Sequence, residues 1–505
     1  MYKLLLCWRY LCTRWVALAS IISVWLGVTV MIAVNSVMGG FATEMRNRIH
    51  GILSDVVFES RSLEGFRDPD WHMAQIRQVL GDGVEGMTPT VTVPAMLSFQ
   101  VRGQWITQQV QMIGIDEHTQ GAVSDFSKYL QHPANRRQLS FDLRESGYDR
   151  FDHQIPNPTR ERKQMRDAGW THRREMAAQE EFLKPRAVPL AVGPPSSGPV
   201  NPFDAPGAPP PAQDNFDPAK EQHTGLVLGI ALSCHRDKDG EDHFLIAPGD
   251  DVKLTFPTAG TPPKAISDSF TIVDFYESKM SESDGSFVFV PLRKLQELRG
   301  MFDPSSGVGF ATSIQIKLKP GVDLNAARDK LRQAFQPALY VVSTWRDKRA
   351  PILDAVQTET AILNVLLFMI IAVAGFGILA VFFMIVVEKT RDIGVLKSLG
   401  ASGSGIMGIF LAYGLALGLV GAGAGMATGL FVVSHINQLA TGLAKLTGQE
   451  VFPPDIYYFY SIPTIVSPTM VASVVAGAVG IAVLASILPA LRAALLHPVE
   501  ALRYE

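Results

Sequence analysis

Hydrophobic residues are concentrated in four long stretches that contain no Asp, Glu, Lys or Arg. These stretches run from Trp15 to Met38, from Ala361 to Val387, from Ala401 to Ser434 and from Tyr457 to Leu491. A helix of about 20 apolar residues crosses a hydrocarbon core of about 30 Å, and each stretch is longer than that. Helices of soluble proteins typically show a polar stripe, which all four lack. We therefore predict membrane-spanning helices over 15–38, 361–387, 405–434 and 465–491.

The first stretch reads as an uncleaved membrane anchor. Its apolar run exceeds the roughly 7–15 residues of a signal peptide, and no small-residue cleavage site precedes polar chain. Helical periodicity instead continues beyond Met38, because Phe41, Met45 and Ile49 recur at helical spacing. The first span is therefore expected to extend into an amphipathic stalk.

Basic residues flank the apolar stretches in a pattern that gives an orientation. They precede the first span, separate the second from the third and follow the fourth: Lys3, Arg9, Arg14, Lys389, Arg391, Lys397, Arg492 and Arg503. Because short cytoplasmic segments are enriched in Lys and Arg, segments 1–14, 388–402 and 492–505 are predicted to be cytoplasmic. Residues 39–360 and a loop over 435–464 then lie outside. The predicted topology is one span, a large external domain and three further spans.

The third span carries a line of glycines with small-xxx-small spacing: Gly414, Gly418, Gly421, Gly425 and Gly429. Such residues let helix backbones approach closely in a membrane, where no hydrophobic drive brings helices together. This face is therefore expected to pack against protein. The neighbour is either another helix of the same chain or a second subunit.

The external region has the pattern of an α+β domain. Alternating apolar and polar residues predict strands, and 3.6-residue periodicity predicts helices. The predicted strands are 55–60, 95–101, 105–115, 252–256, 270–276, 287–290 and 313–318, and the predicted helices are 71–80, 292–298 and 324–335. Residues 135–224 differ, because 160–181 is crowded with charge and 184–218 is rich in proline. We expect this segment to be a flexible insertion, with a solvated helix over 160–181.

Composition and charge exclude several functions. The 505 residues contain 45 Lys and Arg against 48 Asp and Glu, a net charge of −3, whereas nucleic-acid-binding domains are basic. Three cysteines are too few and too scattered for a disulfide framework or a cysteine zinc site. The chain contains no G-x-x-x-x-G-K-[ST] phosphate loop and no G-x-S-x-G nucleophile motif. We predict no catalytic residue, no metal site and no cofactor in this chain, and hence no enzyme activity of its own.

The short cytoplasmic segment between the second and third spans carries a motif. Its apolar residues Ile393, Leu396 and Leu399 recur every three positions, which predicts a short amphipathic helix that Gly400 ends. Charged residues surround this line: Glu388, Lys389, Arg391, Asp392 and Lys397. An ordinary charged loop would satisfy the orientation rule equally well, but it would not need the apolar repeat.

The segment from Glu388 to Ala401 resembles the coupling segment of type VII ABC transporter permeases, the MacB/FtsX/LolC–LolE superfamily. It matches the pattern E-K-x-R-(D/E)-I-G-(V/I)-L-K-x-L-G-A. The 1+3 topology is the same, and the C-terminal segments 488–494 and 497–505 are also similar. Segments 36–41, 113–116 and 345–348 bring the chain nearest to the LolC/LolE permeases of lipoprotein-releasing complexes. The resemblance does not cover residues 135–224.

The resemblance implies a fold, a location and partners. It implies an α-helical membrane protein of the bacterial inner membrane, with four transmembrane helices and a periplasmic α+β domain that has a MacB-like core. Two copies of a LolD-like ATPase, which carry ATP and Mg²⁺, would drive it through the coupling helix. A second permease chain, identical or related, would complete the complex. The other partners would be membrane lipids, a lipoprotein substrate and a LolA-like periplasmic carrier.

The resemblance also implies where the substrate lies. Val34, Met38, Phe41 and Met45 share one face where the first span leaves the membrane, and the family places its lipoprotein cavity at this level. The alternative is that this face packs on the second span of the same or a neighbouring chain. Two other functions are kept open: a MacB-like exporter subunit for peptides or drugs, and an FtsX-like transmitter that regulates a cell-wall hydrolase.

Overall fold

The computed structural model describes residues 15–52, 54–62, 64–101, 103–154, 161–183, 216–236, 242–447 and 461–497. The chain divides into two compact units. Residues 1–47 and 349–505 form a helical unit, and residues 48–348 form an α+β unit. Each unit is described by itself.

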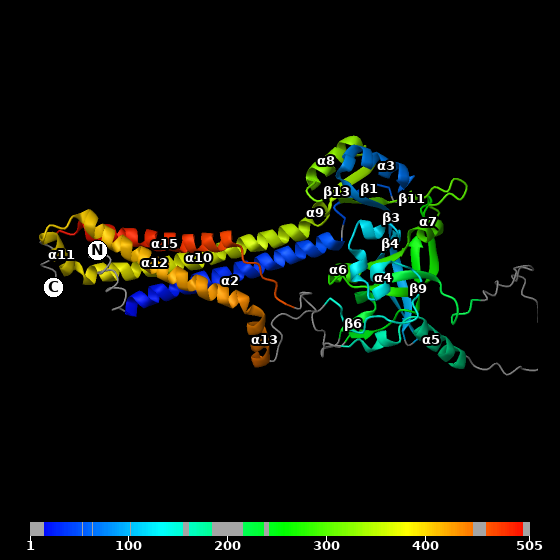
Figure 1. The fold of residues 1–505 in the computed structure, drawn as a ribbon, viewed down its shortest axis with the longest axis horizontal. Helices are drawn as coiled ribbons and strands as arrows, with labels where there is room; N and C mark the ends of the chain where they lie inside the picture. The colour runs from blue at the N-terminus through cyan, green and yellow to red at the C-terminus, as the bar shows by residue number, and fades with distance from the viewer. Residues whose placement is uncertain are drawn as a thin grey trace, which may run out of the picture. The chain divides into compact units, whose positions relative to one another are not determined.

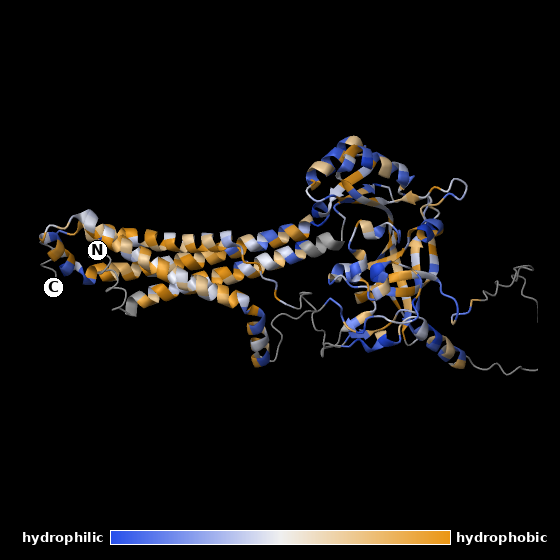
Figure 2. Ribbon diagram, in the orientation of Figure 1, coloured by the Kyte–Doolittle hydropathy of each residue, from blue (hydrophilic) through white to orange (hydrophobic). Residues whose placement is uncertain are grey.

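The helical unit contains the four apolar helices that the sequence predicts (Figures 1 and 2). Its elements are α2 (Trp15–Ile52), α10 (Ala350–Glu388), α11 (Thr390–Ser398), α12 (Gly403–Ser434), α13 (Ile436–Thr447) and α15 (Pro468–Leu495). At 1.5 Å per residue, the 38 residues of α2 and the 39 of α10 each extend over about 57 Å. Because a hydrocarbon core is only about 30 Å thick, both helices continue well beyond it. The continuous helix α2 agrees with the predicted stalk.

The glycines of α12 pack within the chain. A Cβ at Gly421, Gly425 or Gly429 would lie 2.9, 2.7 or 3.1 Å from the Cβ of Val24, Val28 or Ile32 on α2. On the same helix, a Cβ at Gly414 or Gly418 would lie within 3 Å of α15 side chains. The structure therefore decides between the two alternatives for these glycines: their neighbours are helices of the same chain.

Polar side chains reinforce the contact between α2 and α12. The Trp25 indole donates to the hydroxyl of Thr428 at 2.8 Å, and the Thr29 and Thr428 hydroxyls are 2.7 Å apart. Such hydrogen bonds between apolar helices each contribute about 0.6–2 kcal/mol in a membrane. The first helix is thus held to α12 by close backbone approach and by side-chain hydrogen bonds.

The predicted loop over 435–464 contains a helix that the sequence analysis missed. Helix α12 ends at Ser434, and α13 begins at Ile436 after the single residue His435. After α13, the chain returns along α2, where the Ile465 amide donates to the carbonyl of Ser36 at 3.0 Å. Gly40 permits this approach, because a Cβ there would lie 2.2 Å from the carbonyl oxygen of Pro463.

The α+β unit is built on one nine-stranded sheet with the order β13-β1-β12-β3-β4-β10-β5-β9-β8. A further pairing of β3 with β8 closes six of these strands into a ring. The strands of the sheet are β1 (Val56–Ser60), β3 (Val84–Val101), β4 (Gln104–Ile115), β5 (Thr224–Gly229), β8 (Asp251–Pro257), β9 (Ala265–Tyr276), β10 (Phe287–Pro291), β12 (Ser313–Leu318) and β13 (Tyr340–Thr344). Two small sheets pair β2 (Phe66–Arg67) with β11 (Phe310–Ala311), and β6 (Cys234–Arg236) with β7 (Asp242–Phe244).

Helices cover part of this sheet. Helices α3 (Pro69–Leu80) and α8 (Leu324–Ala334) enclose a core against β1, β12 and β13. The remaining helices are α4 (Pro133–Arg137), α5 (Trp170–Leu183), α6 (Ser281–Asp284), α7 (Leu292–Arg299) and α9 (Trp345–Lys348). Strands β1 and β13 are antiparallel neighbours, and their register sets Val56 opposite Thr344.

The prediction that residues 135–224 form a flexible insertion is wrong for the described part of its first half. Leu139, Phe141 and Leu143 are buried with Val227 and Val273 in one apolar cluster. Met165 and Ala168 are buried in the ring core. The proline-rich run over 184–218 lies almost entirely outside the described residues.

A buried ionic cluster fixes this segment to the end of β9. Arg162 donates two hydrogen bonds to the Glu277 carboxylate, at 2.8 and 2.9 Å, and one to Asp242 at 3.2 Å. Lys279 contacts Glu277 and Asp152 from the other side. Burial alone would raise the pKa of Glu277, but Arg162 and Lys279 together lower it well below its ordinary value. The charges compensate one another, so the segment can be both charged and buried.

Candidate functional site

The predicted coupling motif forms the helix α11, which turns the chain from α10 into α12. The helix ends in a Schellman motif: the Gly400 amide donates to the carbonyl of Lys397, and the Ala401 amide donates to that of Leu396. Gly400 has a φ of 93°, a left-handed conformation that favours glycine. The predicted role of Gly400 at the end of the helix is confirmed.

One face of α11 is attached to its own chain. Ile393 is buried in a small apolar cluster with Val386, Ile406 and Ala493, which belong to α10, α12 and α15. Lys397 donates to the carbonyls of Ala494 and Leu496, both at 2.6 Å. Ile393 is therefore buried within its own chain, and the amine of the half-buried Lys397 is bonded to it.

The opposite face of α11 is exposed. Leu399 is 80% exposed and Val395 is 45% exposed. Arg391 and Asp392 are exposed beside them, whereas Leu396 is half-buried at the border of the two faces. Asp392 also accepts a hydrogen bond from Lys389 at 2.7 Å, and Glu388 lies at the end of α10. The predicted apolar line of Ile393, Leu396 and Leu399 is thus divided between an inner and an outer face.

Val395 is the residue of this surface that the sequence analysis missed. It lies four positions before Leu399 and four after Arg391, so the three share one side of the helix. The four-residue spacing was visible in the sequence. The sequence also shows the three-residue repeat that begins at Ile393. Only the burial of Ile393 in the structure shows that the exposed face follows the four-residue spacing.

The second predicted site lies on α2, and all four of its residues, Val34, Met38, Phe41 and Met45, are half-buried. The bundle-facing residues of α2 include the fully buried Val28, Ile32 and Ser36. At 100° per residue, Met38 points to the opposite side of the helix from Ser36 and Ile32. The predicted face is therefore not the face that α12 and the return segment cover.

Helix α10 lies on that same side of α2. A Cβ at Gly27, two turns before Val34, would lie 3.5 Å from Cγ1 of Ile371 on α10. Further toward its N-terminus, α10 exposes large apolar side chains, with Val365 62% and Phe368 56% exposed. The two helices that continue past the hydrocarbon thickness thus present apolar residues near the predicted substrate face.

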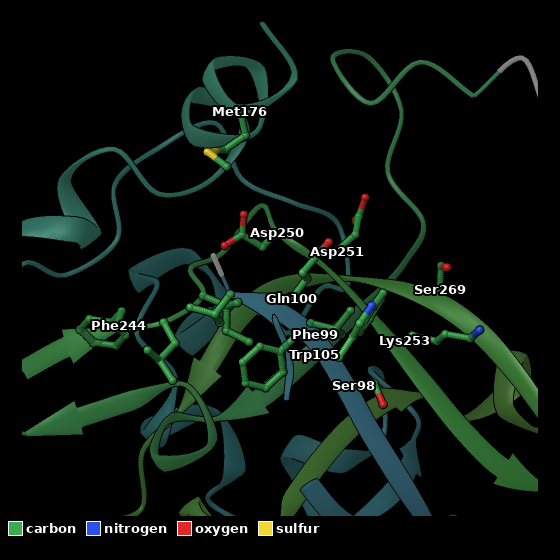
Figure 3. Close-up of a pocket in the computed structure, with 14 residues that line it drawn as sticks. Ser98, Phe99, Gln100, Trp105, Met176, Phe244, Asp250, Asp251, Lys253 and Ser269 are labelled. Carbon is green, nitrogen blue, oxygen red and sulfur yellow. The ribbon is translucent and has the colours of Figure 1, made fainter. Parts of the chain in front are cut away.

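A concave surface lies in the α+β unit, where the tip of the β3–β4 hairpin meets β8 and α5 (Figure 3). This groove has a volume of about 780 Å³. Trp105 and Met176, which line it, are 65% and 46% exposed. Asp250 accepts from His172 at 2.8 Å and Asp251 pairs with Arg173 at 2.7 Å, so the chain itself neutralises these carboxylates. None of the predicted site residues lies in this groove.

Metal chemistry has no support among the described residues. Within the described ranges, no group of three or more His, Cys, Asp or Glu side chains could hold a metal ion. His235 and His243 face each other across β6 and β7, but two imidazoles alone make an incomplete ligand set.

Comparison with known proteins supplies the family. Residues 364–498 match the family described as FtsX-like permease C-terminal. The chain is 24% identical over 492 residues to the lipoprotein-releasing system transmembrane protein LolC of Xylella fastidiosa strain 9a5c, covering 97% of this chain and 94% of that protein. It is 27% identical to LolC of Neisseria meningitidis serogroup B, over 55% of this chain and 65% of that protein. It is 25% identical to LolE of Haemophilus influenzae, over 56% and 65% respectively.

These similarities agree with the motif and with the four apolar helices. The family match covers α11, α12, α15 and the part of α10 from Asn364 onward. The relatives of LolC type extend the likeness through the α+β unit to the first helix. The FtsX-like match and the similarity to LolC and LolE proteins together support a LolC/LolE-type permease, and the four apolar helices support a multi-pass membrane protein.

Proposed function

We propose that this chain is the transmembrane subunit of an ABC transporter that releases lipoproteins from the outer leaflet of the bacterial inner membrane. The observation that carries the proposal is α11, a short helix with an apolar outer face and an inner face attached to three other helices. The LolC and LolE relatives are transmembrane proteins of lipoprotein-releasing systems, which supports the choice of substrate.

In this proposal the outer face of α11 docks into a cytoplasmic ATPase. Leu399 and Val395 enter an apolar groove of that protein, and Arg391 and Asp392 contact its rim. Two ATPase copies with bound ATP and Mg²⁺ serve a pair of permease chains, and the α+β unit lies in the periplasm. Because this chain has no phosphate loop, the energy must come from the partner.

The inner face of α11 transmits the movement. Ile393 packs against residues of α10, α12 and α15, and Lys397 is bonded to the end of α15. Helix α2 follows because the glycines of α12 and the hydroxyl of Thr428 hold it. A push on α11 would therefore move the bundle as one body and reach both long helices.

The substrate face of α2 holds the acyl chains. Val34, Met38, Phe41 and Met45 point away from α12, toward the space that α10 and the second permease chain border. Each CH₂ group that leaves the bilayer costs about 0.8 kcal/mol, so a triacylated lipoprotein needs an apolar path and an external source of energy. A LolA-like periplasmic carrier would receive the released protein.

The proposal is tested by reconstitution. Proteoliposomes that contain this chain, its ATPase and a triacylated lipoprotein should release the lipoprotein to a soluble carrier only when ATP is hydrolysed. A photocrosslinking residue at Met38 should capture acyl chains before hydrolysis and lose them afterwards. Steady ATP hydrolysis without release, with crosslinks only to permease peptides, would contradict lipoprotein extrusion and favour a peptide exporter or a signal transmitter.

The docking face has a sharper test. Leu399→Asp should reduce co-purification of the ATPase at least tenfold, because an unpaired carboxylate in an apolar groove loses its hydration. Leu399→Met is the matched control, since it keeps an apolar side chain of similar volume, and should bind normally. Because Leu399 is 80% exposed, both variants should accumulate in the membrane equally. Normal ATPase binding by Leu399→Asp would show that docking occurs elsewhere.

A further inference from the structure

We propose that α13 is an interfacial helix, which lies in the plane of the membrane with its leucine face in the headgroup region. The leaflet is the one at the opposite end of the bundle from α11. This inference depends on the four apolar helices being membrane spans and is independent of the substrate that the permease moves.

The position of α13 limits what can surround it. It follows the membrane helix α12 after the single residue His435, so it begins where the chain leaves the hydrocarbon core. Figure 1 shows α13 turning away from the long axis of the helical bundle at the end of α12. Since the bundle axis runs across the membrane, a helix at a steep angle to it runs along the membrane surface.

The two sides of α13 differ in chemistry. Leu439, Leu443 and Leu446 lie within about 60° of one another on the helix at 100° per residue. They are 51%, 48% and 86% exposed. Asn437 and Lys445 lie on the opposite side. This division of apolar and polar residues is the signature of a helix at a membrane interface.

Contacts within the chain fix the orientation of α13. The Asn437 side chain accepts from the Ile462 amide at 2.7 Å, and Ile465 is bonded to Ser36 on α2. The side of α13 that bears Asn437 is therefore tied to the return segment. The leucines point elsewhere, and the rest of the described bundle leaves them exposed.

Continuity with α12 and charge both favour lipid as the occupant of the leucine face. A helix anchored at the bilayer boundary by its first residue keeps its apolar side within reach of the acyl chains. From Ile436 to Thr447 the helix contains no acidic residue and one basic residue, Lys445, which suits anionic headgroups. A soluble partner would have to compete with a membrane that is always present.

Spin-label accessibility in the full chain tests this orientation. Single cysteines replace Leu439, Leu446, Thr441 and Lys445 in turn, in a background with Cys7, Cys12 and Cys234 changed to serine. The labelled protein is placed in nanodiscs of phosphatidylethanolamine and phosphatidylglycerol. Labels at 439 and 446 should collide several-fold more with oxygen than with a water-soluble nickel chelate, and labels at 441 and 445 should show the reverse.

Two results would overturn the proposal. Equal access of the nickel chelate to positions 446 and 441 would mean that the leucine face lies in water. Low access of both reagents at 439 and 446 would mean that protein covers the face, as a second copy of the chain would do. Because both leucines are exposed, the cysteine variants should fold like the parent, and an unchanged yield from the membrane checks this.

Discussion

The two units of this protein use opposite means to hold a peripheral element in place. In the helical unit, α2 is held to α12 by the absence of side chains, at Gly421, Gly425 and Gly429. In the α+β unit, the segment around Arg162 is held to β9 by charged side chains that are almost fully buried. Lipid offers no hydrophobic drive for helix association, so contact area must come from close approach. The α+β unit already has a large apolar core and can include a compensated ionic cluster.

The largest effect is expected from the ionic cluster. Glu277→Gln leaves Arg162 and Lys279 buried without their shared carboxylate, which should destabilise the α+β unit by about 3–5 kcal/mol. Hydrogen exchange of the 131–166 segment in the full chain would measure it. The matched control is Glu145→Gln, which removes an exposed partner of Arg174 and should cost at most about 1 kcal/mol. Equal effects of the two variants would mean that burial of the ion pair does not matter.

The glycine contact should be nearly as sensitive. Gly425→Leu puts a side chain where a Cβ would already lie 2.7 Å from Val28 and 2.8 Å from the Trp25 carbonyl oxygen. Overpacking of this kind should cost about 3 kcal/mol and lower the melting temperature in detergent. Gly423→Leu adds the same side chain two positions away, where nothing lies within 4 Å, and should be tolerated. A harmless Gly425→Leu would show that α2 and α12 do not touch here.

Lys397 refines the comparison, because here a charged side chain joins two elements of the helical unit, α11 and the end of α15. Lys397→Met keeps the apolar stem but removes the donor to Ala494 and Leu496, at a cost of about 2 kcal/mol. Faster hydrogen exchange over the last turn of α15 is the expected result. Lys389→Met removes the partner of the exposed Asp392 and should change exchange there by less than about 1 kcal/mol. If exchange in Lys397→Met were unchanged, the Lys397 hydrogen bonds would not stabilise this turn, and its stability would come from the packing of Ile393.

The smallest effect is a dependence on pH in the α+β unit. Burial raises the pKa of Asp284 to about 7 and that of Asp274 to about 6. A raised pKa means that the stability from each group is complete below its ordinary pKa near 3.8 and is lost as pH rises through the folded value. Between pH 6 and 8, Asp284 alone should cost about 1.4 kcal/mol.

Hydrogen exchange of residues 274–286, corrected for the intrinsic rate, would measure this loss as about tenfold weaker protection at pH 8. Asp284→Asn cannot ionise and should show a clearly smaller change, because only Asp274 would still titrate in this range. Protection that stays the same between pH 6 and pH 8 in the parent would mean that both carboxylates ionise with ordinary pKa values.

Local pattern was enough to predict many of the elements. The four charge-free stretches correspond to long apolar helices, because the absence of charge over more than 20 residues is visible without a partner. Helix α3 ends at Leu80, directly before Gly81, whose φ of 61° favours glycine, and the predicted strand 313–318 has the same bounds as β12. These features depend on residues that are near one another in the sequence.

Features that depend on distant contacts could not be predicted. The burial of Ile393 requires Ala493, which lies 100 positions later and packs beside it. The order of residues 135–154 and 161–173 depends on Val227, Val273 and Glu277, which provide apolar contacts and a counter-charge. The alternation of Leu139, Phe141 and Leu143 was a usable signal. The many charged residues that follow concealed it.

The register of β1 and β13 has a mechanical consequence. Val56 lies opposite Thr344, so the chain from α2 enters the pair, and the chain toward α10 leaves it, at the same end. If both connections are pulled in the same direction, the two strands move as one body and the hydrogen bonds between them are not strained. If they are pulled apart, the hydrogen bonds between the strands open one at a time, beginning at that end. The α+β unit can therefore follow a joint motion of the two helices stiffly, whereas spreading them would strain the ladder at its weakest point.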